Sequence, residues 1–462
     1  MLAPISLNLY AGLIALFKMG ATPVFLDPQS GFGQLEKTIS SIRPDGLICG
    51  QKINWLRWFL PDLRRIPRVF PTDGNSRFSL NRLAVSFSPH SEISEVDLES
   101  PALITFTGGS TDPLGSRGVI RTHGLLAAQH AALSRALPND TSDIDMPAFP
   151  IATLHNLASG ITSVIPDFPF RRPDAVRPER ILEQIRQHEV TTASGPPAYW
   201  SVIVEHCLRL QRSLPLRRIV TGGAPVTPFF LEKLERVAPH AEILNVYGST
   251  EAEPVAVIKS CDAMDEMKKP VAPRAGIPLG RAVPEVRIRI LSADGIELET
   301  GQVGEIWVGG NHVARKYFSN PAAESKNKRF DSDGVLWHCM GDLGYKDETG
   351  LLWLAGRVNT IVVRDEKNLY PVFVETMAEA LPFVRRAALI GMPDSKLGER
   401  SVLIVEFAEN SPKPKDWVNQ LRALCGEHGW ALDEIRAARR LPVDARHNSR
   451  LDYKRLKTKR FG

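Results

Sequence analysis

Residues 101–124 read PALITFTGGSTDPLGSRGVIRTHG, and the interpretation of the chain begins there. The apolar run Ala102 to Phe106 predicts a buried strand. The strand leads into a loop of Thr, Gly and Ser that ends at Arg117 and Gly118. Glycines let backbone N–H groups turn toward an anion, hydroxyls add donors and the arginine adds charge, so the loop predicts phosphate binding. It is not a Walker loop, in which Gly-Lys-Ser/Thr opens a helix, and an ordinary turn is the alternative.

The composition is typical of a soluble globular protein. The chain has 462 residues, of which 43% are hydrophobic and 24% charged, and its formal charge is +5. This length suffices for two or three domains. Residues 434–462 hold ten Lys/Arg against three Asp/Glu. No aromatic platform accompanies these charges, so we predict no nucleic-acid partner, while contact with an anionic membrane face stays open.

Cysteine spacing and the start of the chain indicate the compartment. The five cysteines, at positions 49, 207, 261, 339 and 425, show no metal-ligand spacing and predict a reducing environment. The apolar start, residues 1–20, has no basic leader or cleavage site and is too short to span a membrane. We therefore expect a cytoplasmic protein.

Strands and helices alternate from the beginning of the chain. We expect helices over Leu7–Met19 and Gln34–Ile42, and strands over Thr22–Leu26 and Gly46–Cys49. This alternation predicts an α/β fold with a parallel, doubly wound sheet. The run of residues 55–59, with two Trp and a Phe, predicts helix packing, and the polar stretch Asn75–Glu99 predicts a connection.

Two later strands also end in glycine turns. Arg218–Thr221 leaves through Gly222-Gly223-Ala224-Pro225, and Glu242–Tyr247 leaves through Gly248-Ser249-Thr250-Glu251. Thr227 is expected to cap a helix that starts at Pro228. Ligands bind at the carboxyl ends of strands in open α/β sheets, so these turns and the phosphate loop predict one shared cleft. Ordinary strand-to-helix turns are the alternative.

The loop of residues 107–118 resembles the phosphate loop T-x-G-S-T-G-P-x-K-G of the adenylate-forming superfamily, which includes acyl-CoA synthetases, luciferases and peptide-synthetase adenylation domains. The matching residues are Thr107, Gly109, Ser110, Thr111, Pro113 and Gly118, with Arg117 at the basic position. Asp112 replaces a glycine, and Gly115-Ser116 looks like an insertion. A carboxylate about 4 Å from a phosphate oxygen would repel it by roughly 4 kcal/mol at an effective dielectric of about 20. The loop therefore implies ancestry more firmly than full activity.

The segment NVYGSTEAEPVAV, which starts at Asn245, is similar to the superfamily's Y-G-x-T-E signature. The resemblance implies that Tyr247 stacks on adenine, Thr250 meets the α-phosphate and Glu251 holds Mg²⁺, with Asn245 and Gly248 in the same nucleotide site. A flat ring, a hydroxyl donor and a hard oxygen suit these tasks. The turn of Gly222, Gly223, Ala224 and Pro225 resembles the loop that contacts the adenine and the acyl group.

Downstream segments extend the resemblance almost to the end of the chain. WHCMGDLGYKDETGLLWLAGRVNTIVV lies in a β-rich subdomain and is similar to the paired G-D and G-R segments of the family. It implies that Asp342 binds the ribose hydroxyls, that Arg357 reaches the same nucleotide and that Asn359 is the hinge. A small α+β domain of residues 357–462 then follows a large domain of residues 1–356, which is shorter at its start than usual in the family.

The last motif, LPVDARHNSRLDYKRLK, resembles that of fatty-acyl and β-lactone synthetases and places Arg450 at the position of the family's catalytic lysine. Arginine keeps the charge but differs in shape and reach, so we expect weakened adenylation. Lys454 would serve only after a register shift. The apolar segment around His155, with Gly223, implies the acyl pocket, although a lone His in such a run is more often a core residue.

The resemblance implies a small-molecule carboxylate substrate, ATP, Mg²⁺ and coenzyme A as acceptor. We rank activation of a fatty acid to acyl-AMP, followed by transfer to coenzyme A, first. A β-lactone synthetase acting on a 2-alkyl-3-hydroxy acid is the second interpretation. The third is a degenerate, non-catalytic binder of nucleotide or acyl ligand, favoured by Asp112, Arg450 and the short start.

Overall fold

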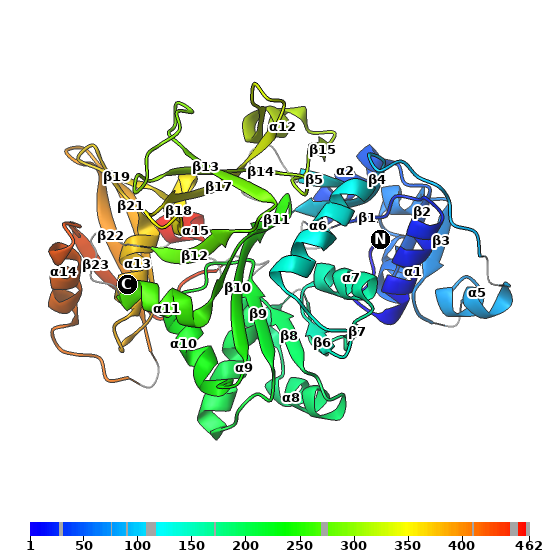
Figure 1. The fold of residues 1–462 in the computed structure, drawn as a ribbon, viewed down its shortest axis with the longest axis horizontal. Coiled ribbons are helices and arrows are strands. Elements are labelled where there is room, and N and C mark those ends of the chain that lie inside the picture. The colour runs from blue at the N-terminus through cyan, green and yellow to red at the C-terminus, as the bar shows by residue number, and fades with distance from the viewer. Residues whose placement is uncertain are drawn as a thin grey trace.

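The computed structural model describes residues 1–26, 31–74, 76–88, 91–107, 117–170, 172–268, 276–408, 411–443 and 451–458, without the side chain of Thr107. Figure 1 shows the N-terminal elements at one end of the molecule, the C-terminal elements at the other and the largest sheet between them. Among the described residues, no helix combines the length and apolar character needed to cross a bilayer.

The first part of the chain forms two small sheets. The parallel pair β2 (Gly46–Cys49) and β3 (Arg68–Pro71) packs with α2 (Phe32–Ile42) and α4 (Pro61–Arg64). A four-stranded sheet has the order β1 (Val24–Phe25), β4 (Pro101–Thr107), β5 (Arg117–Thr122), β15 (Lys316–Phe318). The remaining helices of this part are α1 (Leu7–Lys18), α3 (Gln51–Leu56) and α5 (Leu80–Ser86). The strand predicted before the phosphate loop is confirmed as β4, but it lies outside the largest sheet.

Twelve strands form that largest sheet. Its order is β13 (Val286–Leu291), β14 (Gly304–Gly310), β17 (Leu336–Lys346), β18 (Leu352–Arg357), β12 (Ile277–Ala282), β11 (Ala252–Lys259), β10 (Glu242–Ser249), β9 (Arg218–Gly222), β8 (Thr192–Gly195), β6 (Ile144–Pro147), β7 (Thr162–Ser163), with β16 (Lys328–Phe330) on β17. Neighbours from β7 to β10 are parallel, and those from β10 to β13 are antiparallel. The predicted β-rich subdomain is thus continuous with the parallel strands through β12.

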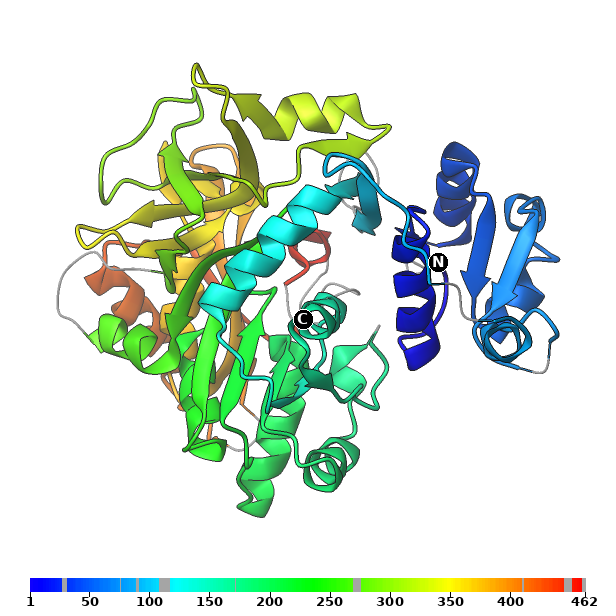
Figure 2. The same cartoon turned by 45° about the vertical axis from the view of Figure 1, so that its right-hand side comes forward.

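Helices cover both faces of the parallel strands, which confirms the predicted doubly wound α/β fold (Figure 2). One side carries α8 (Pro178–Gln187), α9 (Pro197–Leu210), α10 (Pro228–Val237) and α11 (Ser260–Lys268), and the other carries α6 (His123–Ala136) and α7 (Pro150–Ser159). The short α12 (Pro321–Asn327) and η1 (Pro173–Ala175) complete this part of the chain. Thr227 caps α10 as predicted, because its hydroxyl oxygen accepts from the Phe230 N–H at 3.3 Å.

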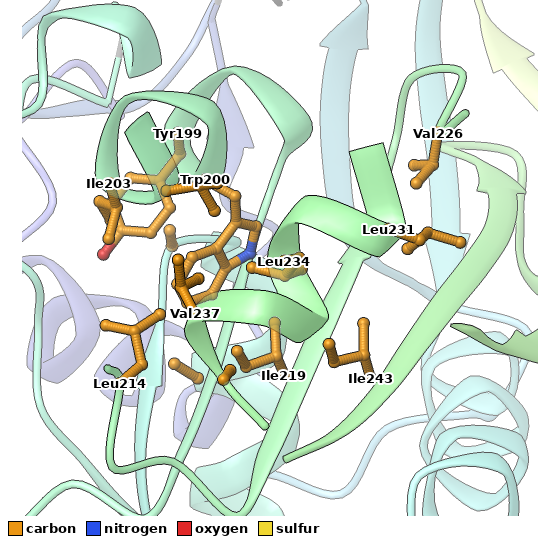
Figure 3. Close-up of a cluster of buried hydrophobic side chains, with 14 of the residues drawn as sticks. Tyr199, Trp200, Ile203, Leu214, Ile219, Val226, Leu231, Leu234, Val237 and Ile243 are labelled. Carbon is orange, nitrogen blue, oxygen red and sulfur yellow. The ribbon is translucent and has the colours of Figure 1, made fainter. Parts of the chain in front are cut away.

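The main core lies between the parallel strands and the first of these helix layers. Figure 3 shows Trp200 of α9 packed beside Leu234 of α10 and above Ile219 of β9. All three side chains are fully buried. Since side chains alternate between the faces of a strand, the neighbours of Ile219 along β9 face the opposite layer. This core fixes the strand ends from which the glycine turns leave.

The C-terminal segment forms the predicted small α+β unit. Its sheet has the order β20 (Lys367–Leu369), β19 (Val362–Arg364), β22 (Gly398–Phe407), β21 (Val384–Asp394), with β23 (Glu434–Ala438) on β22. Its helical elements are η2 (Val358–Thr360), α13 (Pro371–Glu379), α14 (Trp417–Glu427) and α15 (Tyr453–Thr458). The unit has a core of its own, and α13 also sends Phe373 into the main core.

Two expectations for the segment after β2 are wrong. The aromatic run is not packed, because Trp55, Trp58 and Phe59 expose 66%, 64% and 64% of their surface. The supposed polar connection contains α5, a two-turn helix over Leu80–Ser86. Within α5, Leu80 is half-buried near Gly12 of α1, whereas Val85 is exposed.

Candidate functional site

The glycine turn after β9 lies at the carboxyl edge of the parallel strands. Gly222 pairs with Val246 of β10, and an added Cβ would overlap the Val246 carbonyl oxygen. Gly223 has a φ of 75°, which glycine adopts without strain, and its Cβ position lies 3.7 Å from the Phe149 ring. Ala224 and Pro225 continue the turn toward α10. The predicted positions are therefore adjacent to β10.

The Y-G-S-T-E segment forms an antiparallel hairpin of β10 and β11, with Thr250 and Glu251 at its tip. Asn245 is buried within β10 beside Thr221, and Gly248 lies near the strand's end. Two backbone contacts hold the tip. The guanidinium of Arg121 in β5 donates to the Thr250 carbonyl at 2.9 Å, and the Ala314 N–H donates to the Glu251 carbonyl at 2.7 Å.

Glu251 points into a buried group of aromatic and basic side chains. It is 8% exposed, and the hydroxyl of Tyr317 donates to its Oε1 at 2.9 Å. The Lys328 ammonium lies 4.8 Å from the centre of the Tyr317 ring, and the Arg117 guanidinium carbon lies 5.8 Å from it. Arg117, which follows the phosphate loop, is therefore brought next to Glu251 from a different sheet.

These neighbours keep the Glu251 carboxyl ionised. Burial alone would raise its pKa, but nearby positive charge and the Tyr317 hydrogen bond hold the pKa below its usual value. His338 is the nearest basic ring, yet burial lowers its own pKa to about 4, so it is neutral near pH 7. At neutral pH, Lys328 supplies the charge, although burial lowers its pKa to about 8.

An ionised, hard carboxylate at the tip of the hairpin suits Mg²⁺. Among the described residues, no group of three His, Cys, Asp or Glu side chains could hold a metal ion. A cation at Glu251 would therefore take its other ligands from phosphate oxygens and water, which is the usual arrangement for Mg²⁺ in nucleotide sites. Glu251 therefore fits the predicted Mg²⁺ as its one protein ligand, with phosphate oxygens and water as the others.

Asp342, Tyr247 and Arg357 form a second group. The Tyr247 hydroxyl donates to Asp342 Oδ2 at 2.9 Å, and Arg357 Nε donates to Asp342 Oδ1 at 2.7 Å. Asp342 and Arg357 are register partners on β17 and β18, whereas Tyr247 comes from β10. Two residues from Tyr247, the Ser249 hydroxyl contacts Met340 Sδ at 3.8 Å. The carboxylate predicted for a ribose thus lies beside the hairpin that carries Glu251.

His155 lies on α7 and is paired with His130 of α6. Their Nδ1 atoms are 2.9 Å apart, and the ring centres are 4.8 Å apart. His155 is 8% exposed, and burial, followed by repulsion from His130, lowers its pKa to about 4. The helix starts after Phe149, whose ring lies near Gly223. Gly223 is therefore near the start of the helix that carries His155, and a shared acyl pocket stays a prediction.

Several predicted residues lie outside the described part of the chain. These are Gly109, Ser110, Thr111, Asp112 and Arg450; of Thr107 the backbone is described, paired with Arg117. Asn359, predicted as the hinge, is exposed in η2 directly after β18. The structure therefore brings together the Y-G-S-T-E residues, Arg117, Asp342 and Arg357, and leaves the phosphate-loop residues and the proposed catalytic cation as predictions.

The segments that flank Arg450 are described and are firmly anchored. Val443 and Leu451 form an antiparallel bridge, and α15 begins two residues later. The Tyr453 hydroxyl donates to Glu375 of α13, at 2.7 Å from Oε1 and 2.9 Å from Oε2, and Leu456 is 1% exposed. Lys454 lies on the exposed side of α15. A register shift that moved Lys454 to the position of Arg450 would break these contacts.

Burial raises the pKa of Glu375 to about 8, with partial compensation by Tyr453. Between about pH 4.5 and 8 the folded chain keeps a proton that the unfolded chain loses, so this group lowers the free energy of unfolding as pH rises. We expect Glu375→Gln to gain stability relative to wild type between pH 5 and pH 8 in denaturant unfolding. The control for the lost charge is Glu427→Gln, because Glu427 is exposed on α14. A difference in unfolding free energy between Glu375→Gln and wild type that does not change with pH would contradict the prediction.

Sequence reasoning missed three residues that organise the site: Arg121, Tyr317 and Lys328. Arg121 was detectable, because it is a charged residue two positions from the apolar Val119 in β5 and therefore faces the same, buried side of the strand. Tyr317 and Lys328 carried no comparable signal. They come from a segment that is more than 60 residues from Glu251 in sequence, and only the pairing of β15 with β5 and of β16 with β17 brings them near.

Comparisons with known proteins agree with this geometry. The model of the family "AMP-binding enzyme" matches residues 1–318. An olefin β-lactone synthetase of Stenotrophomonas maltophilia is 30% identical over 96% of this chain and 83% of its own length. An indoleacetate–CoA ligase of Aromatoleum aromaticum is 28% identical over 67% of this chain and 58% of its own. An amide bond synthetase from Marinactinospora thermotolerans shares the fold, with a TM-score of 0.83 at 24% identity over 99% of this chain and 88% of that one.

Proposed function

Because this chain belongs to the AMP-binding enzyme family, we propose that it uses ATP to convert a fatty acid into an acyl-adenylate. Adenylate-forming activation of a small-molecule carboxylic acid is the chemistry of the family. The observation that carries the proposal is the placement of Glu251 beside the Tyr247–Asp342–Arg357 group on adjoining strands. The choice of a fatty acid rests on the sequence resemblance, because the buried residues of α7 are the polar Thr153, His155 and Asn156.

In the proposed reaction, a carboxylate oxygen attacks the α-phosphorus of ATP, the new P–O bond forms and pyrophosphate leaves. No protein nucleophile is needed, so positioning and charge neutralisation supply the rate. Asp342 would bind the ribose hydroxyls, the Tyr247 ring would lie against adenine and Thr250 would donate to the α-phosphate. Mg²⁺ held by Glu251 would offset phosphate charge. Arg450 would approach from the C-terminal unit.

We also propose that residues 1–356 and 357–462 act as two domains that rotate about Asn359 between half-reactions. Asn359 is exposed in the short η2 that links β18 to β19. Few residues must change conformation there, which is what a hinge requires. The C-terminal unit has a core of its own, which supports the division, and a rotation would have to withdraw Phe373 of α13 from the main core.

For the second half-reaction, we rank closure of a β-lactone above transfer to coenzyme A, which reverses the order of the sequence-based prediction. Two olefin β-lactone synthetases resemble the chain over 96% of its length, whereas the indoleacetate–CoA ligase aligns over 67%. The His130–His155 pair adds a chemical reason. When one Nδ1–H donates to the other Nδ1 and each ring carries one proton, the pair has one acceptor and one donor at its Nε2 atoms, and a hydroxyl group can use both.

The test is ATP–pyrophosphate exchange with a panel of acids, followed by product analysis with and without coenzyme A. We expect exchange with long-chain acids, and β-lactone from a 2-alkyl-3-hydroxy acid in the absence of coenzyme A. The matched 3-deoxy acid should give exchange but no lactone. Thioester as the sole product, formed only with coenzyme A, would restore the original ranking. No exchange with any acid by the folded protein would establish the degenerate interpretation.

A further inference from the structure

The short helix α3 and the turn after it expose three large aromatic side chains. Trp55, Trp58 and Phe59 are 66%, 64% and 64% exposed. Their i, i+3, i+4 spacing places them on one side of the helical segment, which hydrogen bonds extend past Leu56 through Phe59. The rings of Trp55 and Phe59 touch, with centres 5.0 Å apart. Three adjacent exposed aromatic side chains form a patch rather than scattered apolar exposure.

Basic residues are frequent in the segment that carries this aromatic patch. Residues 51–68 contain five Lys/Arg and one Asp, a net formal charge of +4. The Arg57 guanidinium carbon lies 5.4 Å from the centre of the Trp58 ring. Lys52, Arg64 and Arg68 are exposed, and the single acidic residue is already paired with Arg65 at 2.8 Å. Residues 51–68 are therefore positive on balance, and two carboxylates from outside this segment, Asp73 and Glu36, accept from the backbone N–H groups of Gln51 and Asp62.

We propose that this surface, formed by the aromatic patch with Lys52, Arg64 and Arg68, docks on a bilayer that contains anionic lipids. Tryptophan and phenylalanine rings enter the region between headgroups and acyl chains, and flanking Lys and Arg side chains meet anionic headgroups. The strands β2 and β3 that flank α3 in sequence lie at the end of the molecule opposite the C-terminal sheet, so a flat surface can approach without meeting the moving unit (Figure 1).

Docking at this face goes beyond the proposed catalytic function and does not depend on it. It concerns where the protein takes up an apolar substrate, because a long-chain acid partitions into bilayers far more than into water. The candidate catalytic residues lie on other elements, so catalysis and docking can be altered separately.

The experiment is cosedimentation of the full chain with vesicles of phosphatidylcholine alone or mixed equally with phosphatidylglycerol. We expect at least tenfold tighter binding to the anionic vesicles, weaker binding at high salt and a blue shift of tryptophan emission. Trp55→Ser/Trp58→Ser/Phe59→Ser should lower the affinity at least tenfold. Lys52→Gln/Arg64→Gln/Arg68→Gln should abolish the preference for anionic lipid while leaving the aromatic patch intact.

Phe330→Ser is the matched control, because Phe330 is 65% exposed on β16, away from the patch, and its loss should not change binding. The far-UV circular dichroism and thermal unfolding of both triple variants should match those of the wild type, which verifies folding. Equal binding to neutral vesicles, absence of binding, or an aromatic variant that binds like wild type would overturn the proposal. So would a wild-type dimer, in sedimentation velocity, that the aromatic variant dissociates. If the aromatic variant is unstable, the charge variant decides alone.

Discussion

Glu251→Ala is expected to lower the rate of ATP–pyrophosphate exchange by about a hundredfold or more, as the loss of one preorganised electrostatic group does in other enzymes. Glu251 is the buried carboxylate at the tip of the β10–β11 hairpin, and its neighbours hold its pKa below the usual value. Without it, the proposed Mg²⁺ loses its protein ligand. Apparent affinity for Mg²⁺, read from a Mg²⁺ titration of nucleotide binding by calorimetry, should fall in parallel.

Alanine also leaves the buried Lys328 ammonium with Glu324 but without Glu251 as a counter-charge, so the variant is expected to be less stable. Glu251→Gln separates the two effects, because its amide oxygen still accepts from Tyr317 while the charge is lost. The matched control is Glu242→Ala, a carboxylate at the opposite end of β10 that pairs with Arg218 and Lys259. Wild-type exchange rates in a folded Glu251→Gln protein would remove Glu251 from the mechanism.

Arg450→Lys is expected to raise the adenylation rate by about tenfold, equivalent to roughly 1.4 kcal/mol in the barrier. An ammonium on a flexible stem reaches a single phosphate oxygen more readily than a planar guanidinium does. The bridge of Val443 with Leu451 and the anchor of Tyr453 on Glu375 hold the flanking backbone, so the substitution changes the side chain and not the register.

Lys454→Ala is the control for this prediction. Lys454 is exposed on α15, and its loss should leave adenylation unchanged in both the wild-type and the Arg450→Lys backgrounds. A large loss with Lys454→Ala would show that the tail does slip by four residues. An unchanged or lower rate with Arg450→Lys would contradict the interpretation of position 450.

The alternation of elements was predictable because local signals and tertiary packing agree. Thr227 before Pro228 predicted the start of α10, and the apolar run 102–106 predicted β4. Strand partnership was not predictable to the same extent. β5, the strand after the phosphate loop, pairs with β15, about 200 residues away. Neither β4 nor β5 pairs with the strands that carry the other glycine turns, so the strands expected in one sheet are divided among three. Non-local pairing leaves no mark in any short window of sequence.

In the site, too, residues within one continuous motif were predictable, and contacts between distant segments were not. Tyr247, Glu251, Asp342 and Arg357 were identified through motifs that each lie in one continuous segment. The ring of Tyr317 between Arg117 and Lys328 was not, because three separate segments build it. The exposed aromatic run was misread for a related reason: spacing tells which residues share a side of a helix but not whether anything covers that side.

Arg357 takes part in two structures at once. Its side chain pairs with Asp342, while its backbone N–H donates to the Thr360 hydroxyl at 3.2 Å and starts the turn that leads into the C-terminal sheet. A ribose that captured the Asp342 oxygens would compete with this guanidinium and release it. Nucleotide binding would then free the Arg357 side chain at the start of the turn that joins the two parts of the chain. Release of AMP would let the Arg357–Asp342 ion pair form again.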